Sequence, residues 1–248
     1  LIFLYTHVLN QPLGVVDVVW AQKPKRLPVV LTQAEVKVVL QHLTGVPLLV
    51  VQLLYGGGLR LNEALRLRVQ DLDFGQKLMM VRDGKGQKDR TTILPDTAVQ
   101  PLKQHLTTVQ QLHHEDLQQG HGRVPLPHAL RRKYVNAECE WVWQFVFPST
   151  NLSRDPRQDD SPLYRWHLHA STIQKAVRQA AKTANLSKRV TPHTFRHSFA
   201  THLLTINTDV VTVQNLMGHD DIRTTMEYFH LGNRPSSKPQ SPMDIIYP

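Results

Sequence analysis

Apolar residues recur at helical spacing along most of this chain, and they predict a mainly helical domain. In one segment Phe195, Phe199 and Leu203 lie four residues apart and mark a buried stripe. Thr191 suits the N-cap of this segment, and Pro192 suits the first helical position, where its missing N–H costs nothing. We therefore expect a helix to begin at Pro192.

The first half of the chain predicts further helices and a small sheet. Thr32 and Glu35 form a capping box ahead of an apolar stripe, and residues 47–55 are apolar almost throughout, which predicts a buried helix that ends at glycines 56–58. Residues 78–82 and 91–94 predict two short strands. A long helix is expected over residues 96–117. The fold class is thus α+β, mainly α-helical, with a small antiparallel β-sheet near the N-terminal half.

Helical spacing returns in the last third of the chain. Ser171 is expected to cap a helix that carries Lys175 and Arg178 on its outer face. Another helix is expected to end at Gly218, the usual C-terminal residue type. Asp221 can cap the last helix. The apolar stripe of that helix is predicted to contain Ile222, Met226 and Phe229, with Tyr228 off the stripe.

Prolines and basic residues separate the ends of the chain from its middle. Residues 21–30 predict a basic linker, residues 1–20 the end of a helix followed by an irregular exit, and residues 235–248 a Ser/Pro-rich tail. The main domain is expected over 31–234. Within it, residues 120–170 are the least regular part.

Composition narrows the class of partner. The chain of 248 residues has 29 Lys+Arg against 20 Asp+Glu, a net charge of +9, which favours a polyanion, and nucleic acid over a membrane. Its one cysteine, Cys139, excludes an internal disulfide and fits a reducing compartment. Neither a signal peptide nor a membrane span is predicted. Fourteen His raise the idea of a zinc protein, but one Cys and no HExxH spacing count against it, and no metal is expected.

Several basic residues occur where a phosphate could bind. His193 and Arg196 lie one turn apart at a helix start, whose free N–H groups favour anions. Arg60 follows a glycine turn and is well placed to grip a phosphate through its planar guanidinium. The simpler interpretation of His193 and Arg196 is a solvated basic face. For Arg60 it is a surface ion pair with Glu63. The hairpin loop between the predicted strands is basic too, with Lys85, Lys88 and Arg90.

Aromatic residues accompany basic ones in the irregular region. Trp141 and Trp143 follow the run Arg131, Arg132 and Lys133. Aromatic side chains among basic ones suit the stacking of nucleic-acid bases. Packing of both tryptophans onto the domain is the alternative.

Taken in order, the pieces GGGLRLNEALRL, DGKGQKDR, TPHTFRHSFATHLL, LMGHDD and TTMEYFH resemble the tyrosine recombinase family over about residues 30–232. The segment LPHALRRKYVNAECEWVWQFVFPS further resembles the insertion, here about residues 120–147, that distinguishes integron integrases. The resemblance implies that residues 1–20 are the remnant of an N-terminal DNA-clamping domain.

The resemblance implies a role for each motif residue in DNA transesterification. Tyr228 would attack a phosphodiester and form a 3′-phosphotyrosyl link, while Arg60 and Arg196 would stabilise the charged transition state. Lys85 would protonate the leaving 5′-oxygen. His193 would be the acid–base partner of the tyrosine, and His219 would hydrogen-bond the phosphate. Because the protein supplies the cations and the covalent link stores the bond energy, neither a metal nor ATP nor another cofactor is expected.

The implied partner is DNA, including folded single-stranded hairpins with extrahelical bases, and the implied assembly is a tetramer on DNA. The DNA contacts are expected from Lys88, Arg90, Arg131, Arg132, Lys133, Trp141, Trp143, Lys175 and Arg178. The location implied is the bacterial cytoplasm, at the nucleoid. Two alternatives remain: another tyrosine recombinase or phage-type integrase, and a DNA-binding fragment that is inactive without its N-terminal domain.

Overall fold

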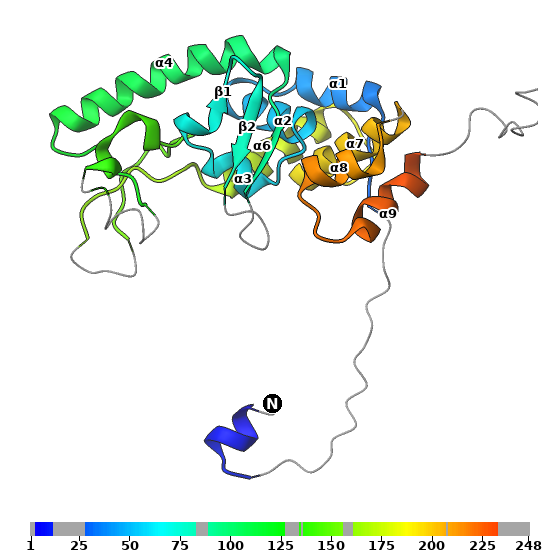
Figure 1. Cartoon of the computed structure of the whole chain (residues 1–248), viewed down its shortest axis with the longest axis horizontal. Helices are drawn as coiled ribbons and strands as arrows, with labels where there is room; N and C mark the ends of the chain where they lie inside the picture. Colours follow the sequence, from blue (N-terminus) through cyan, green and yellow to red (C-terminus); the bar gives the residue numbers. More distant parts are fainter. Residues whose placement is uncertain are drawn as a thin grey trace, which may run out of the picture.

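The computed structural model describes residues 3–11, 28–82, 89–126, 134, 136–155, 161–206 and 208–232, with the backbone only for 227 and 229–232. The α-helices are α1 (Gln33–Gln41), α2 (Gly45–Gly56), α3 (Leu61–Arg66), α4 (Asp96–Gln118), α6 (Ala170–Thr183), α7 (Pro192–Thr205), α8 (Val210–Met217) and α9 (Ile222–Gly232). The strands are β1 (Leu72–Asp73), β2 (Leu78–Val81) and β3 (Arg90–Ile93). Short helical turns span Leu4–Val8, Val69–Asp71, Ala137–Cys139 and Trp141–Trp143 (Figure 1).

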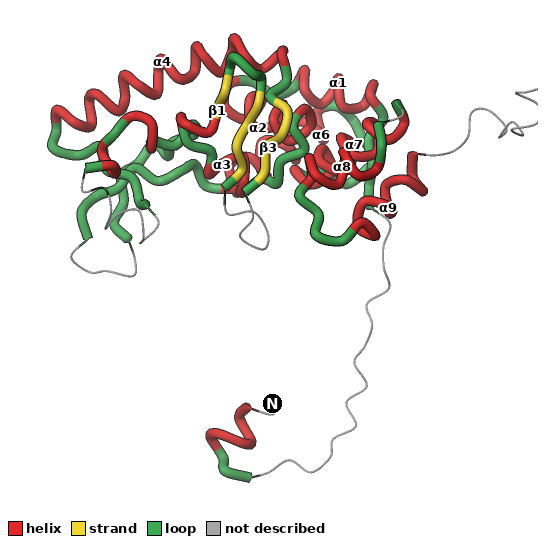
Figure 2. Tube along the Cα trace, in the orientation of Figure 1, coloured by secondary structure: helices red, strands yellow, loops and turns green. Residues whose placement is uncertain are grey.

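Helix α2 lies at the centre of the domain because nearly all of its side chains are apolar. Leu49, Val50, Val51, Leu53 and Leu54 are all buried. Helices α1, α3, α4, α6 and α7 pack around it (Figure 2). The predicted buried helix is therefore confirmed, and so is the capping box of Thr32 and Glu35 at the start of α1.

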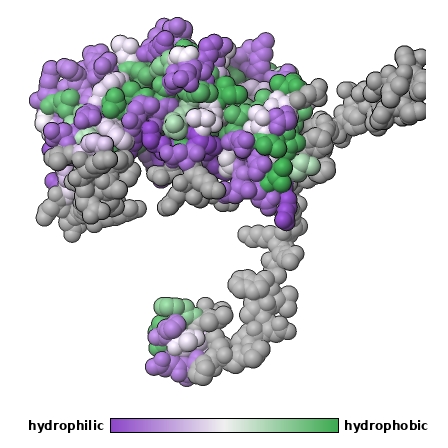
Figure 3. Space-filling view, in the orientation of Figure 1, coloured by the Kyte–Doolittle hydropathy of each residue, from purple (hydrophilic) through white to green (hydrophobic). Residues whose placement is uncertain are grey.

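A second, smaller core joins the three C-terminal helices. It consists of Phe199, Ala200, Leu204, Val213, Met217 and Tyr228, and Tyr55 of α2 borders it as well as the main core. Around it, Ile206, Val211 and Ile222 are exposed. Hydrophobic residues accordingly gather among hydrophilic ones at this end of the visible face (Figure 3). In the described part of the chain, no helix combines the length and the apolar character that crossing a membrane requires.

The sheet is antiparallel in the order β1-β2-β3, with Met79 of β2 paired to both Leu72 and Thr92. The predicted hairpin is confirmed, and β1 adds a strand that its two residues were too few to reveal. Met79 is fully buried and Thr92 donates a 2.6 Å hydrogen bond to Gly57 O. The sheet is thereby fixed against the glycine turn that follows α2. The turn of the hairpin, with Lys85 and Lys88, lies outside the described residues.

Helix α7 begins at Pro192 with Thr191 as its N-cap, as predicted. Phe195 and Phe199 are buried, as the stripe requires. The simpler interpretation, a solvated basic face, does not hold for Arg196, which is only 3% exposed. Helix α7 is buried on most sides, since it lies between α2 and α9 and packs against both.

Two expectations for the last helices were wrong. The N-cap of α6 is His169, not Ser171: the His169 ring accepts a hydrogen bond from Ser171 N, so Ser171 lies inside the first turn. On α9, Ile222 is 42% exposed and Met226 is half-buried, while the side chain of Phe229 lies outside the described part. Among the described side chains of this helix, the buried ones are Thr225 and Tyr228. These two residues lie three positions apart, on the side of α9 that packs against α7 and α8. Because both carry a hydroxyl group, a search for apolar positions did not identify this side of the helix.

The described part of the region between α4 and α6 is irregular, as predicted, but it is held by several side-chain contacts. Arg165 forms a two-armed ion pair with Asp116 at the end of α4. Arg68 donates to the carbonyls of Trp143 and Pro125, and its guanidinium lies 4.6 Å from the centre of the Phe145 ring. These contacts fasten the segment to the main core.

Candidate active site

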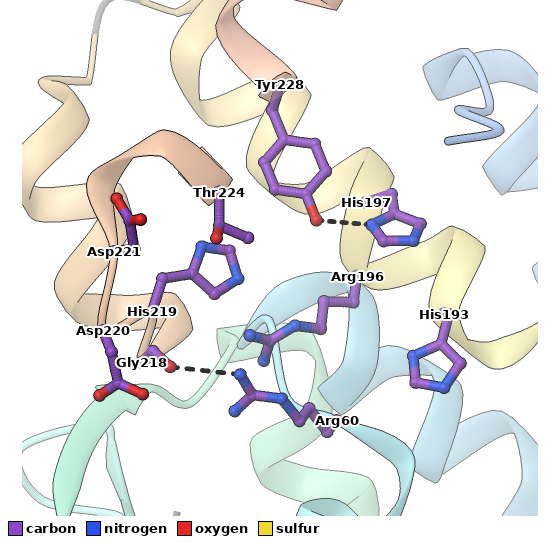
Figure 4. A pocket seen from close by; sticks show the side chains of 10 residues that line it. All are labelled: Arg60, His193, Arg196, His197, Gly218, His219, Asp220, Asp221, Thr224 and Tyr228. Carbon is purple, nitrogen blue, oxygen red and sulfur yellow. Dashed lines mark hydrogen bonds between the residues drawn. The ribbon is translucent and has the colours of Figure 1, made fainter. Parts of the chain in front are cut away.

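A cavity of about 240 Å³ opens where α3, α7, α8 and α9 meet. It brings together the side chains that the sequence motifs had marked, although they are up to 168 residues apart in the chain (228 − 60). Its lining consists of Arg60, His193, Arg196, His197, Gly218, His219, Asp220, Asp221, Thr224 and Tyr228 (Figure 4). Among the predicted catalytic residues, only Lys85 lies outside the described part of the chain.

Arg60 is the N-cap residue of α3, directly after the glycine turn. Its backbone N–H donates to Glu63 Oε2 at 2.8 Å, and its Nη1 donates to Glu63 Oε1 at 2.6 Å. The predicted Arg60–Glu63 pair therefore exists, but Glu63 is nearly buried, with 10% of its side chain exposed. The pair is a fixed part of the site and not a loose surface contact.

Arg196 lies deep in the cavity wall. Its two terminal nitrogens donate to Gly58 O and to Met217 O, each at 2.5 Å. Burial first, and then the charge of Arg60, lowers the pKa of Arg196 to about 9, which still leaves the group protonated at neutral pH. Gly58 has φ of +65°, and a Cβ there would lie 2.4 Å from the Phe199 ring, so this turn requires glycine.

One carboxylate serves three guanidinium groups. Glu63 accepts from Arg60, accepts two bonds from Arg90 at 3.1 and 2.7 Å, and lies 3.7 Å from Arg196. Burial raises the pKa of Glu63, but the hydrogen bonds and charges of Arg90 and Arg60 outweigh it and lower the pKa to about 2. Glu63 is therefore ionised, and the cluster keeps an excess of positive charge.

The same three arginines also bind the C-terminal end of α8. Leu216 O accepts from Arg90 Nε at 3.1 Å, Met217 O from Arg196, and Gly218 O from Arg60 Nη2 at 3.2 Å. The last carbonyls of a helix have no partner within the helix and carry partial negative charge, so cations suit them. This arrangement fixes the segment that carries His219 to the arginine cluster.

Arg90 thus faces inward, with 10% of its side chain exposed. Sequence reasoning placed it among the DNA contacts, because a basic residue in a hairpin is usually solvated. In the structure its guanidinium is used by Glu63 and by Leu216 O. Gly218, at φ of +61°, leaves room for it: a Cβ there would lie 2.7 Å from Arg90 Cδ.

His219 follows the end of α8 and is neutral. Its Nδ1 is 2.9 Å from Thr225 Oγ1. Burial, followed by the charges of Arg196, Arg60 and Arg90, lowers the pKa of His219 to about 3. Its ring stacks on that of Tyr228, with 6.0 Å between the centres.

Tyr228 projects from α9 into the cavity, and its hydroxyl is 2.8 Å from His197 Nδ1 (Figure 4). His193, one turn earlier on α7, is exposed at the open side of the cavity. Its pKa is lowered by partial burial and by the charges of Arg196 and Arg60. The tyrosine hydroxyl, two arginines and three histidines therefore share one cavity.

The predicted DNA contacts lie elsewhere or outside the described residues. Lys175 and Arg178 are exposed on α6. Trp141 is half-buried against the main core, with its ring 6.0 Å from that of His113, and Trp143 is half-buried beside Arg68. The residues outside the described part are Lys88, Arg131, Arg132 and Lys133.

Sequence reasoning missed Glu63 and His197 as site residues. Glu63 had been considered only as a partner in a surface pair, and burial is not visible in a motif. His197 lies four residues after His193, which places both on one face of α7. That spacing was a usable signal, but nothing in the sequence shows which of the two histidines meets the tyrosine.

Comparison with known proteins shows the family of the chain. A model of the phage integrase family matches residues 30–234. An integrase/recombinase from Escherichia coli and one from Pseudomonas aeruginosa are each 42% identical over the whole chain, which covers 73% of their length. The tyrosine recombinase XerD of Staphylococcus saprophyticus is 32% identical over 73% of the chain, which spans 48% of that protein.

Among solved structures, the XerA recombinase is similar with a TM-score of 0.58 and 27% identity, over 85% of this chain and 63% of that one. The chain belongs to the phage integrase family, and its fold is that of the tyrosine recombinase catalytic domain. Enzymes of this family cleave and rejoin DNA, and the chain is an enzyme of this class.

Proposed function

We propose that the chain is the catalytic domain of a site-specific recombinase of the integron integrase type, acting on DNA through a 3′-phosphotyrosyl intermediate. The observation that carries this proposal is the shared cavity: the Tyr228 hydroxyl lies in the same space as Arg60 and Arg196. A phosphodiester in that cavity would meet a nucleophile and two fixed cations, the groups that phosphoryl transfer requires.

The roles of the residues follow from their environments. Arg60 and Arg196 are held by backbone carbonyls and Glu63, so they need little rearrangement when negative charge develops on the phosphate. Neutral His219 would donate or accept a hydrogen bond at a non-bridging oxygen without adding charge. Lys85 is proposed as the acid for the leaving 5′-oxygen. In the sequence it lies between β2 and β3, and β3 packs against α8, whose C-terminal end binds the arginine cluster.

The integron type is proposed from the segment between α4 and α6. It is anchored on Arg68 and Asp116, and it presents Trp141 and Trp143 as half-buried side chains. XerH was solved in complex with its palindromic difH substrate, and it shares only the fold, at 22% identity. For this chain we propose DNA hairpins with extrahelical bases as substrates, a tetramer as the active assembly, and the bacterial cytoplasm as its location. The alternative within the family is a phage-type integrase.

Covalent capture tests the function. The chain is incubated with a pool of nicked duplexes of random sequence and, separately, of bulged hairpins, and the adducts are separated on a denaturing gel and sequenced. We expect an adduct that Tyr228→Phe abolishes while DNA binding persists. Absence of an adduct with retained binding would favour the alternative of an inactive DNA-binding fragment. The sequence recovered, here called the captured site, serves the experiments below.

Competition binding tests the integron type. If Trp141 and Trp143 stack on bases, replacing both by Ala should weaken binding to a bulged hairpin more than to a perfect duplex, by about 1–3 kcal/mol per stacked base. Lys175→Ala is the control, because loss of a phosphate contact should weaken both substrates alike. If the tryptophan variant loses affinity equally for the bulged hairpin and the perfect duplex, the segment has a structural role. The proposal would then be reduced to a tyrosine recombinase of no particular type.

A further inference from the structure

We infer that His197 is the catalytic base that takes the proton from the Tyr228 hydroxyl. This inference rests on the proposed function and changes the group expected from the family resemblance, which was His193. His197 Nδ1 lies 2.8 Å from Tyr228 Oη, within hydrogen-bond distance, and the two rings are 5.4 Å apart at 34°. A general base must reach the proton that it removes, and this contact meets that condition in the protein without DNA.

The other two histidines of the cavity are less suited to take the proton from Tyr228. His193 lies at the open side, its ring 6.5 Å from that of His197. It is one turn further from Tyr228 along α7. His219 lies beside the Tyr228 ring, but its Nδ1 is engaged with Thr225, and burial with the nearby arginines lowers its pKa to about 3. A group so weakly basic is a poor proton acceptor from a phenol.

The Oη–H bond of Tyr228 breaks and its proton moves to His197 Nδ1, which gives an imidazolium. Tyr228 Oη forms a bond to phosphorus, the bond from phosphorus to the 5′-oxygen breaks, and that oxygen takes a proton from the acid, for which we propose Lys85. In the rejoining reaction the 5′-hydroxyl returns its proton to the acid and its oxygen bonds to phosphorus, the bond from phosphorus to Tyr228 Oη breaks, and His197 returns the proton to Oη.

The charges around His197 favour this transfer only when DNA is bound. Arg196 and Arg60 supply a positive field that stabilises a phenolate but opposes an imidazolium. The other titratable groups that line the cavity are His193, His219, Asp220 and Asp221. A bound phosphodiester brings a negative charge that offsets the imidazolium. The base is therefore poised in the free protein and becomes effective when the substrate arrives.

The chain contains a matched control on the same helix. His202 of α7 also holds a tyrosine hydroxyl through Nδ1, that of Tyr55 at 2.9 Å, but this pair lies outside the cavity. His202→Asn removes a histidine–tyrosine contact of the same kind with no change in the site. Asn is a suitable replacement at both positions, because its amide sits at about the same reach as Nδ1 and can hold the hydroxyl without being a base.

The experiment measures single-turnover adduct formation against pH. The substrate is the captured site with sulfur in place of the leaving 5′-oxygen, so the acid is not needed and only the base shapes the profile. For the unaltered chain we expect the rate to rise with pH and level off once the base is deprotonated. For His197→Asn we expect a rate lower by roughly 10²–10⁴ that continues to rise over the range where the unaltered chain is level. His202→Asn should keep the profile of the unaltered chain.

Each outcome decides. A His197→Asn profile that matches the unaltered chain in rate and shape overturns the inference, and so does loss of the plateau in His193→Asn but not in His197→Asn. A second variant, His197→Ala, checks the result once a gel shift has verified that it binds DNA. Added imidazole should restore part of its rate. If imidazole restores nothing at any concentration and the His197→Asn profile is that of the unaltered chain, the inference is also overturned. If the unaltered chain forms no adduct on any DNA, the proposed function fails first and this inference with it.

Discussion

Two buried arginines in this domain have opposite surroundings. Arg165, under the irregular region, meets Asp116 through two parallel hydrogen bonds of 2.8 and 2.5 Å, and its third nitrogen binds the carbonyls of Ser149 and Thr150. Arg196, in the cavity wall, binds two carbonyls as well, but the carboxylate it faces lies 3.7 Å away and is shared with Arg60 and Arg90.

We propose that this difference separates a structural charge from a functional one. At Arg165 one cation is neutralised by one anion, which leaves no attraction for a further ligand. At Arg196 three cations share one buried anion beside an open cavity, whose other carboxylates, Asp220 and Asp221, are exposed. Burial, together with the charges of the arginines, lowers the pKa of His193 and of His219. A buried charge without a full partner is costly, so its presence favours a ligand of opposite charge.

The largest contrast is expected from removing each arginine in turn. Arg196→Met should reduce adduct formation on the captured site by roughly 10²–10³, as expected for a lost donor to the transition state. Arg165→Met should leave the folded protein able to form the adduct, but it leaves Asp116 buried without its partner and should lower the free energy of unfolding by about 3–5 kcal/mol. Single-turnover kinetics and urea unfolding measure the two effects. Equal losses of activity and stability in both variants would contradict the distinction.

That contrast also shows what the sequence could and could not predict. The helices and the hairpin follow from periodicity, caps and glycines, and the motif order marked Arg60, Arg196, His219 and Tyr228, which the structure brings to one cavity. Burial was the missing quantity. The sequence could not show that Arg90 turns inward or that Glu63 is shared, because both depend on contacts between β3, α3 and α8 that are far apart in the chain.

The next effect concerns Glu63, the anion that the three arginines share. Its pKa is about 2 in the folded protein against 4.5 as the ordinary value, so its stabilisation is fully present above pH 4.5 and is lost as the pH falls towards 2. The shift corresponds to at most about 3 kcal/mol. Glu63→Gln should therefore lower the free energy of unfolding at pH 7, and the gap from the unaltered chain should shrink at pH 3. A gap of the same size at both pH values would show that the carboxylate charge is not the cause.

A smaller effect tests the placement of Arg90. Because its guanidinium is occupied by Glu63 and Leu216 O, Arg90→Gln should leave the salt dependence of DNA affinity unchanged while it lowers the cleavage rate. Lys175→Gln is the matched change on an exposed face and should reduce the slope of log affinity against log salt by about 0.9, the value for one lost contact with a duplex phosphate. Filter binding of the captured site over a series of salt concentrations measures both slopes. A reduced slope for Arg90→Gln would return it to the DNA-binding surface.

The smallest effect needs no DNA. If the charge around Arg196 is uncompensated, inorganic phosphate should bind in the cavity and stabilise the folded chain, by about 1.4 kcal/mol at ten times its Kd. For a domain of this size that corresponds to a rise in Tm of roughly 3–6 °C. Thermal unfolding in phosphate is compared with unfolding in chloride at equal ionic strength. The rise should vanish in Arg196→Met, whose cavity has lost a cation, and persist in Arg165→Met and Lys175→Gln, whose missing charges lie outside the cavity. An equal rise in Tm for the unaltered chain and all three variants would mean that phosphate acts on the general surface charge. The cavity would then have no more affinity for an anion than the rest of a chain that carries a net charge of +9.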